Sequence, residues 1–130
     1  MKKSMFQCRV YYEDTDLAGI VYYANYLKFI ERARSEWVRS IGLDQNVLRK
    51  DHGIVFAVRK VEADYLKSAK FDDLLTITTE LKNKTRVRLK FCQHVYRGNE
   101  LIFTAILEIV PLGVSGHLMK LPKTIYDKFT

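Results

Sequence analysis

The order of apolar and polar residues changes its period along the chain. Near the N-terminus every second residue is apolar: Phe6, Cys8, Val10 and Tyr12 alternate with Gln7, Arg9, Tyr11 and Glu13. This spacing of two predicts a half-buried β-strand. After a polar turn at residues 14–19, apolar residues recur every three or four positions, at Tyr26, Ile30, Ala33, Trp37 and Ile41. That spacing predicts an amphipathic helix of about four turns, and Gly42 stands where a glycine commonly follows a helix end.

The rest of the chain favours β-strands. A short helix or loop is expected at residues 44–51. Four strands follow, predicted at residues 54–65, 75–81, 87–95 and 101–112. Residues 97–99, Arg-Gly-Asn, are typical of a hairpin turn, and the long apolar run of the last strand indicates a central strand with both faces covered. The tail from Lys120 has room for one helical turn.

The predicted elements define an α+β fold. One long helix packs on an antiparallel five-stranded sheet, and residues 1–130 are of a length suited to a single domain. One helix covers only one face of such a sheet. We therefore expect a homo-oligomer, in which a second copy buries more of the sheet.

Composition limits the classes of function. The chain has 22 Lys and Arg against 15 Asp and Glu, a net charge of +7 that favours an anionic partner. The basic residues are spread along the chain, which argues against nucleic acid. No apolar stretch approaches the roughly 20 residues of an integral membrane segment, and no apolar region of an export signal follows Met1, so a cytoplasmic location is expected. Two distant cysteines and three scattered histidines predict neither a disulfide framework nor a metal site.

The turn before the helix is the first place where chemistry could occur. Asp14 and Asp16 lie in it, and Gly19 lets the backbone bend. The start of a helix offers unpaired N–H groups and a positive dipole end, which suit an anion or a polarised carbonyl oxygen. A nearby carboxylate could attack that carbonyl or activate water. Spacing alone favours turn and capping chemistry for an Asp-x-Asp pair, with Asp14 as the structural member.

The same region resembles a known enzyme family. Residues 11–27, YYEDTDLAGIVYYANYL, followed by ERAR at 31–34, resemble the signature of the hot-dog-fold acyl-CoA thioesterases. Within them the chain is most similar to the 4-hydroxybenzoyl-CoA thioesterase group and its bacterial Tol–Pal-associated branch. Supporting similarity extends through ADYLKSAKFDDL at 63–74 and FCQHVYR at 91–97, and ends near Leu121 and Pro122.

The resemblance implies both an activity and a site. It implies hydrolysis of acyl-CoA thioesters without cofactor or metal, by dimers or tetramers with active sites at subunit interfaces. It assigns the catalytic carboxylate to Asp16, as nucleophile or general base, and the carbonyl-polarising backbone amide to Tyr23. We also expect Gly19 and Val21 of the same turn to bind the substrate. The Tol–Pal-associated branch commonly has His in place of Tyr23, and relatives often have Pro in place of Ser68.

Coenzyme A carries several phosphate charges, which gives the basic surface a specific use. Candidate phosphate contacts are Lys60, Lys67, Lys70, Arg86, Arg88 and Lys90, of which we single out Lys60, Arg86 and Arg88. An ordinary solvated charge is the alternative for each. Asn25 is expected either to orient the substrate or to cap the helix, and Glu31 to pair with Arg34 or Arg39.

Two other functions compete with hydrolysis. A hot-dog dehydratase would use a His together with a carboxylate, and no His lies near Asp16 in the sequence. A non-catalytic module would bind acyl-CoA, acyl-carrier protein or a polyanion through its basic surface, with exposed aromatic residues along basic strands. The aromatic residues here mostly follow core periodicity, so the binding module is the second hypothesis.

Overall fold

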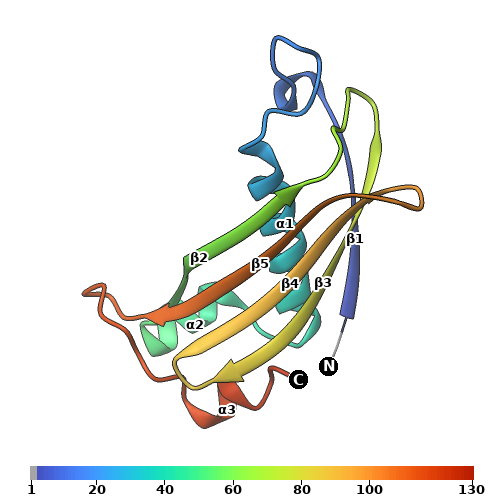
Figure 1. Cartoon of the computed structure of the whole chain (residues 1–130). Coiled ribbons are helices and arrows are strands. Elements are labelled where there is room, and N and C mark those ends of the chain that lie inside the picture. The colour runs from blue at the N-terminus through green and yellow to red at the C-terminus, as the bar shows by residue number, and fades with distance from the viewer. Residues whose placement is uncertain (1–2) are drawn as a thin grey trace.

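The computed structural model describes residues 3–130 and forms a strongly curved sheet around one long helix (Figure 1). The strands are β1 (Lys3–Arg9), β2 (Val55–Tyr65), β3 (Leu74–Thr85), β4 (Arg88–Arg97) and β5 (Glu100–Leu112). The helices are α1 (Asn25–Ser40), α2 (Gln45–His52) and α3 (Lys123–Tyr126), with a short 3-10 turn at Tyr12–Asp14.

The five strands form one antiparallel sheet. Their order is β1-β3-β4-β5-β2, so β1 and β2 are the edges and β4 is the middle strand. The α+β architecture and the four predicted later strands are confirmed. Gly98 has φ +60° in the β4–β5 hairpin, which is the conformation that the Arg-Gly-Asn sequence suggests.

Helix α1 lies against the concave face of the sheet and supplies much of the core. Its apolar stripe is buried from Tyr26 to Trp37, as the spacing predicts, with Trp37 and Ile30 at 0% exposure, and Ile41 just beyond the helix is partly buried. The helix ends at Ser40, and Gly42 adopts φ +86°, as a glycine following a helix end does. Residues 45–52 form a true helix because Asp44 accepts hydrogen bonds from the amides of Asn46 and Val47.

Two predicted strand features differ from the structure. The first strand ends at Arg9 rather than near Tyr12, because the Tyr11 amide donates to Asp14 Oδ2 (2.8 Å) and a 3-10 turn begins. The β5 strand is central, but its outer face is open: Ile106 is 41% exposed. The prediction that both faces of this strand are covered is therefore wrong for one chain, since the helix lies on the concave side only.

The C-terminal segment closes one end of the fold. Leu121 and Phe129 are fully buried, and the predicted helical turn is α3. Arg86 anchors the segment, because its Nε donates to the Leu121 carbonyl (2.7 Å) and its own carbonyl accepts from the Leu121 amide (2.7 Å). Among residues 3–130, no helix is both long enough and apolar enough to span a bilayer.

Candidate active site

The turn between β1 and α1 projects from one end of the molecule, opposite α2 and α3 (Figure 1). Residues 14–22 form a small antiparallel hairpin, which we call the ribbon. The Tyr22 amide donates to the Asp14 carbonyl (2.8 Å), Thr15 bridges Val21, and the Asp16 amide donates to the Ile20 carbonyl (2.9 Å). Gly19, at φ +82°, makes the reversal between the two arms. The ribbon thus brings Asp16, Gly19 and Val21 together.

The two carboxylates of this ribbon have different surroundings. Asp14 is 7% exposed, and its Oδ2 accepts from the Tyr11 amide (2.8 Å). Asp16 is exposed, and its Oδ1 accepts from the Ala18 amide (2.9 Å) and, more weakly, from the Ile20 amide (3.4 Å). Within residues 3–130 its Oδ2 makes no hydrogen bond. Asp14 is therefore the structural member of the pair, and Asp16 presents a free oxygen to solvent.

The backbone at the start of α1 has an available donor. The Asn25 amide donates to the Tyr22 carbonyl (2.8 Å) and the Leu27 amide to the Ala24 carbonyl (3.2 Å). In the described chain the Tyr23 amide makes no hydrogen bond. It lies two residues before the first residue of a 16-residue helix, where the positive end of the helix dipole adds to its strength as a donor.

Aromatic residues fix this stretch of backbone. The Tyr65 hydroxyl of β2 donates to the Tyr23 carbonyl (2.9 Å), and the two rings meet edge to face with centroids 6.3 Å apart. Burial is the main cause that raises the pKa of Tyr65, so its hydroxyl stays protonated as a donor. Val21, 3% exposed, donates its amide to the Ala69 carbonyl (2.8 Å). The Tyr23 peptide is thereby held in place with its N–H unpaired.

The structure corrects two side-chain expectations on α1. Asn25 does not cap the helix: it is the first helical residue, it is buried, and its Nδ2 donates to the Asp14 carbonyl (3.0 Å). A capping side chain would accept a hydrogen bond there, so Asn25 instead ties α1 to the ribbon. Glu31 accepts from the Ser35 hydroxyl (2.9 Å) rather than pairing with Arg34 or Arg39.

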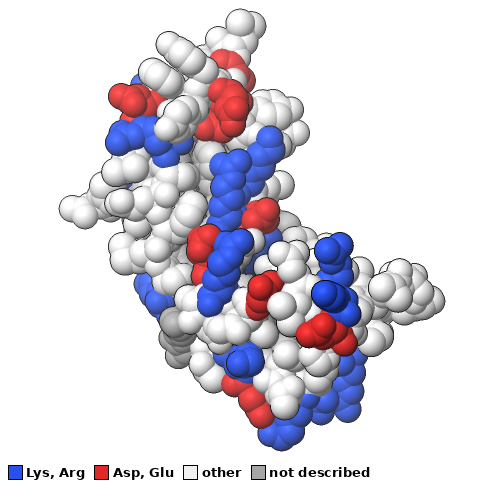
Figure 2. All heavy atoms as spheres, turned by 180° about the vertical axis from the view of Figure 1, so that it is seen from behind, with Lys and Arg blue, Asp and Glu red and all other residues white. Residues whose placement is uncertain are grey.

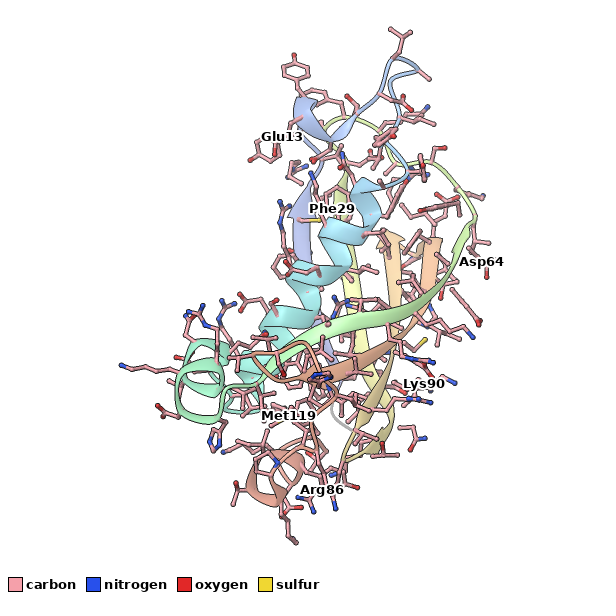
Figure 3. All side chains as sticks on the ribbon, turned by 90° about the vertical axis from the view of Figure 1, so that its left-hand side faces the viewer. Glu13, Phe29, Asp64, Arg86, Lys90 and Met119 are labelled. Carbon is pink, nitrogen blue, oxygen red and sulfur yellow. The ribbon has the colours of Figure 1, made fainter. Side chains whose placement is uncertain are left out.

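The selected basic residues lie far from the ribbon within one chain. Figure 3 places Arg86 at the end of the molecule opposite Glu13, which belongs to the ribbon end. Lys60 pairs with Glu62 (3.0 Å), and Arg88 lies 3.7 Å from Glu108, both on the outer face of the sheet. A single chain does not bring these three residues together with Asp16.

Positive charge on the helix side is interspersed with negative charge. Figure 2 shows a band of Lys and Arg side chains down this face with acidic side chains between them. Several of the basic residues are paired, as Arg39 is with Glu36. The face therefore carries no uninterrupted basic surface of the kind that nucleic acid requires.

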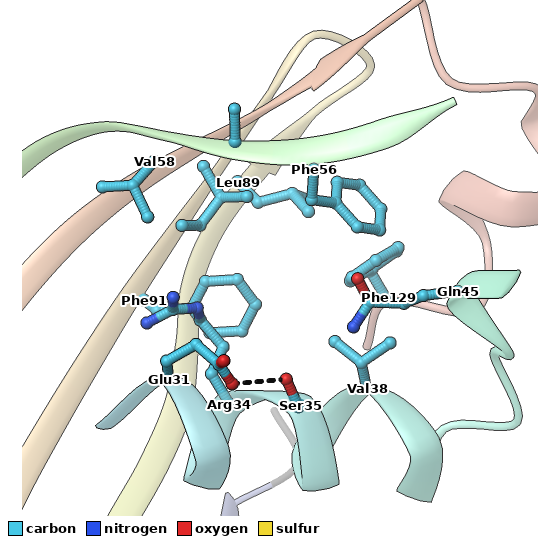
Figure 4. Close-up of a pocket in the computed structure, with 12 residues that line it drawn as sticks. Glu31, Arg34, Ser35, Val38, Gln45, Phe56, Val58, Leu89, Phe91 and Phe129 are labelled. Atoms are coloured by element: carbon cyan, nitrogen blue, oxygen red, sulfur yellow. Dashed lines mark hydrogen bonds between the residues drawn. The ribbon is translucent and has the colours of Figure 1, made fainter. Parts of the chain in front are cut away.

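A cavity that the residue pattern does not predict lies between α1, β2, β4 and the C-terminal segment (Figure 4). Its volume is about 240 Å³. Its apolar walls are formed by Val38, Phe56, Leu89, Phe91, Ile109 and Phe129. Arg34 also lines it and donates to Gln93 Oε1 (3.0 Å); burial lowers the pKa of Arg34, and Glu31 opposes this. The sequence signal for this polar pair is Gln93, a polar residue in the inward phase of a strand whose alternate residues Phe91 and Val95 are buried.

The outer face of the sheet carries a second unpredicted group. Cys92 Sγ lies 3.4 Å from His94 Nε2, and His94 Nδ1 lies 2.8 Å from Thr104 Oγ1. Burial raises the pKa of Cys92 and lowers that of His94, so both stay neutral near pH 7. Cys8 and Cys92 are free, part-buried thiols, as predicted. In the part of the chain that the structure describes, no cluster of three His, Cys, Asp or Glu could hold a metal.

Comparison with known proteins identifies the family. The sequence model of the thioesterase superfamily matches residues 18–103. The acyl-CoA thioesterase YbgC of Haemophilus influenzae is 39% identical over 110 residues, 83% of this chain and 81% of that protein. Among solved structures, a probable thioesterase from Bartonella henselae is 36% identical with a TM-score of 0.88, covering 93% of this chain and all of that one.

The 4-hydroxybenzoyl-CoA thioesterase of a Pseudomonas species is similar as well. It is 25% identical with a TM-score of 0.90, covering 98% of this chain and 99% of that one. The hot-dog architecture is thus shared along the whole length. The chain therefore belongs to the thioesterase superfamily, in the hot-dog-fold group of the YbgC acyl-CoA thioesterases.

Proposed function

We propose that the chain hydrolyses acyl-CoA thioesters to the free acid and CoA, with Asp16 as the reacting carboxylate and the Tyr23 amide as the group that polarises the carbonyl. The observation that carries the proposal is that the segment between β1 and α1 holds both an exposed carboxylate with one oxygen unbonded and an unpaired amide before the helix. The YbgC relatives are acyl-CoA thioesterases by name, which supports the same substrate class.

The proposed mechanism begins at the carbonyl. The thioester oxygen accepts a hydrogen bond from the Tyr23 amide, and the α1 dipole stabilises the negative charge that develops on it. Asp16 Oδ2 then attacks the carbonyl carbon, CoA leaves as the thiolate, and water hydrolyses the resulting anhydride. In the alternative route Asp16 takes a proton from a water molecule that attacks directly.

The ribbon supports these roles by holding Asp16 in one orientation. The Ala18 amide fixes Oδ1, which leaves Oδ2 for chemistry. The Asp14 carbonyl holds the Tyr22 amide on one side of the Tyr23 amide, and the Tyr65 hydroxyl holds the Tyr23 carbonyl on the other. Asn25 Nδ2 fixes the Asp14 carbonyl in turn. A catalytic group held by its neighbours needs no reordering when the substrate binds.

The test is turnover of an acyl-CoA panel by wild type, Asp16→Asn and Glu13→Gln. Asp16→Asn should lower kcat by about 10²–10⁴-fold, because an amide neither attacks nor accepts the proton. Glu13, an exposed carboxylate of the same turn, is the control and should keep wild-type turnover. Loss of the thioester itself is followed, since Cys8 and Cys92 could react with thiol dyes. Wild-type turnover by folded Asp16→Asn would reject the assignment; no hydrolysis by wild type would favour a binding module.

We further propose that residues 1–130 act as one thioesterase domain in a cytoplasmic homodimer or homotetramer. The basic residues Lys60, Arg86 and Arg88 lie away from Asp16 in one chain, so a second subunit is the means to bring such residues to the CoA phosphates at each site. Acyl-carrier protein, whose thioester has the same chemistry, is a further candidate partner. No cofactor enters the proposed reaction.

A further inference from the structure

The cavity beside α1 is partly open to the surface and is large for a protein of this size. Interiors are packed nearly as densely as organic crystals and keep few voids larger than a water molecule. An apolar cavity of about 150 Å³ is enough to bind benzene. The cavity here measures about 240 Å³, and its lining is aromatic and aliphatic apart from Glu31, Arg34, Ser35 and Gln45. A hollow of this size and lining has the properties of a site for an apolar ligand.

We propose that this cavity receives the far end of a long acyl chain, and that Phe129 is the residue that limits the length of that chain. The inference rests on the proposed function, because it requires the thioester to lie at the start of α1. It adds a substrate class, acyl groups of about ten carbons or more, and a residue that determines specificity.

One face of α1 connects the two places. Leu27, Glu31, Ser35 and Val38 follow one another at intervals of four, four and three, so they share a face of the helix. The last three line the cavity, and Leu27, 41% exposed, lies on the same face towards the helix start. This face therefore runs from the first turn of α1, which follows Tyr23 in the chain, to the cavity.

The helix also sets the distance. At 1.5 Å per residue, Glu31 lies about 12 Å and Val38 about 22 Å along the axis from Tyr23. An extended alkyl chain advances about 1.25 Å per carbon–carbon bond, given its bond lengths and angles. Acyl groups of about ten carbons therefore reach the near edge of the cavity, and groups of about sixteen to eighteen reach its end.

The polar residues at the cavity do not oppose an alkyl chain. Glu31 already accepts from Ser35, and Arg34 already donates to Gln93. Their opposite charges lie close enough that Glu31 raises the pKa of Arg34 against the effect of burial. An alkyl chain therefore leaves these pairs intact, whereas a charged ligand would have to displace them.

Phe129 closes the far end. It is 0% exposed, its ring stacks on Trp37 with centroids 5.9 Å apart, and it meets Phe56 edge to face at 5.9 Å. Figure 4 shows its ring opposite Phe91 across the cavity. A smaller side chain at position 129 deepens the cavity, and a larger one at position 38 fills it.

The test compares kcat/KM for butyryl-, dodecanoyl- and octadecanoyl-CoA. Val38→Phe should lower the octadecanoyl-to-butyryl ratio by about tenfold or more, because only the longer chain reaches position 38 and a difference of one methylene in an apolar pocket already changes kcat/KM by that order. Phe129→Leu, chosen because it keeps an apolar core residue, should raise the octadecanoyl-to-dodecanoyl ratio several-fold. Tyr126→Ala is the control, because Tyr126 of the same segment contacts Lys84 and does not line the cavity. It should leave both ratios unchanged.

A binding measurement separates this inference from the proposed mechanism. Trp37 is the sole tryptophan, and its ring contacts Phe91 and Phe129 of the cavity wall. Titration with octadecanoate should change its fluorescence saturably in wild type and in Asp16→Asn, but at least tenfold more weakly in Val38→Phe. A saturable signal with no hydrolysis would refute the mechanism alone. Unchanged ratios in both cavity variants, or no saturable signal, would overturn the cavity assignment; so would a change of oligomeric mass without a change of ratio in Val38→Phe.

Discussion

Asp14 and Asp16 show how neighbouring residues of one type acquire different tasks. The Asp14 side chain is buried and accepts a hydrogen bond from the Tyr11 amide. The Asp14 carbonyl accepts hydrogen bonds from the Tyr22 amide and from Asn25 Nδ2. Asp16 points outwards with one oxygen unbonded within the described chain. An Asp-x-Asp pattern in a turn predicted one structural carboxylate, and the geometry agrees. Its catalytic partner could be named only by resemblance, because spacing does not say which oxygen remains free.

Tyr23 provides a test of the amide as distinct from the side chain. We expect Tyr23→Phe to keep kcat within about threefold of wild type, because the proposed donor is the backbone N–H and the Tyr65 bond goes to the Tyr23 carbonyl. Steady-state kinetics with the best acyl-CoA of the panel would measure it. Tyr65→Phe is the informative companion, since it removes the hydroxyl that holds this peptide. A fall of 10²-fold or more in Tyr23→Phe would show that the phenol takes part in the reaction.

His94 provides a pH test. Burial, Lys3 and Lys82 lower its pKa below 6.5, against an opposing effect of Glu80. A lowered pKa in the folded state means that the unfolded chain takes up the proton first. The stability that neutral His94 contributes is therefore present above about pH 6.5 and is lost as the pH falls through the folded-state pKa.

Urea unfolding from about pH 7.5 to 5 would measure this contribution. The free energy of unfolding of wild type should fall relative to that of His94→Gln, in which no imidazole titrates. A constant difference between the two proteins across this range would contradict the prediction, because other titrating groups are common to both.

At the scale of the elements, β3 carries two adjacent threonines with opposite hydrogen bonding. Thr79, fully buried, accepts from Gln93 Nε2 (2.8 Å), and the same Nε2 donates to the Ile30 carbonyl of α1 (2.8 Å). Thr78, 7% exposed, has a buried hydroxyl oxygen without a partner in the described chain. Gln93 thus joins β3 and β4 to the helix, while Thr78 carries an unsatisfied polar atom.

This contrast predicts opposite effects of the same substitution. Thr78→Val should raise the free energy of unfolding by about 1 kcal/mol, because it removes an unpaired buried hydroxyl at nearly constant shape. Thr79→Val should lower it by about 1–3 kcal/mol, because Gln93 loses an acceptor. Urea denaturation of the two variants beside wild type measures both. Equal destabilisation would indicate that the Thr78 hydroxyl is satisfied in solution.

The elements differ in how well the sequence predicted them. Helix α1 and strands β3 and β4 were predicted because each buries one face, so periodicity reports their surroundings directly. Gln93, Arg34 and Phe129 escaped prediction because their roles depend on contacts between segments distant in the chain. The early end of β1 escaped for a related reason: side-chain bonding by Asp14 overrides an alternation that continues in the sequence.

At the scale of the whole molecule, β2 is an incomplete edge. It has 11 residues, pairs only with β5, and exposes apolar side chains along its length. Val55, Val58, Val61 and Tyr65 are 37–46% exposed. A long edge strand with free N–H and C=O groups is a template for pairing with another chain, and pairing of two identical edges gives a two-fold symmetric interface. The opposite edge, β1, is shorter, and Met5, 73% exposed, is the one large exposed apolar residue within Lys3–Arg9.

We therefore expect a homo-oligomer that contains a β2–β2 contact. Light scattering after gel filtration at about micromolar concentration should give at least twice the chain mass of 15.3 kDa. Val61→Lys, which places a charge on the exposed apolar strip of β2, should weaken association by about tenfold or more, the equivalent of about 1.4 kcal/mol. Met5→Lys places the same charge on the β1 edge and should leave the mass unchanged.

Turnover links this edge to the proposed site. If a second subunit supplies the basic residues that one chain keeps away from Asp16, kcat/KM of Val61→Lys should fall on dilution in step with its mass. Wild type and Met5→Lys should keep their kcat/KM and their oligomeric mass over the same range of protein concentration. A monomeric wild type with full activity would contradict both the β2 interface and the shared site. An oligomer weakened by Met5→Lys and not by Val61→Lys would move the interface to β1.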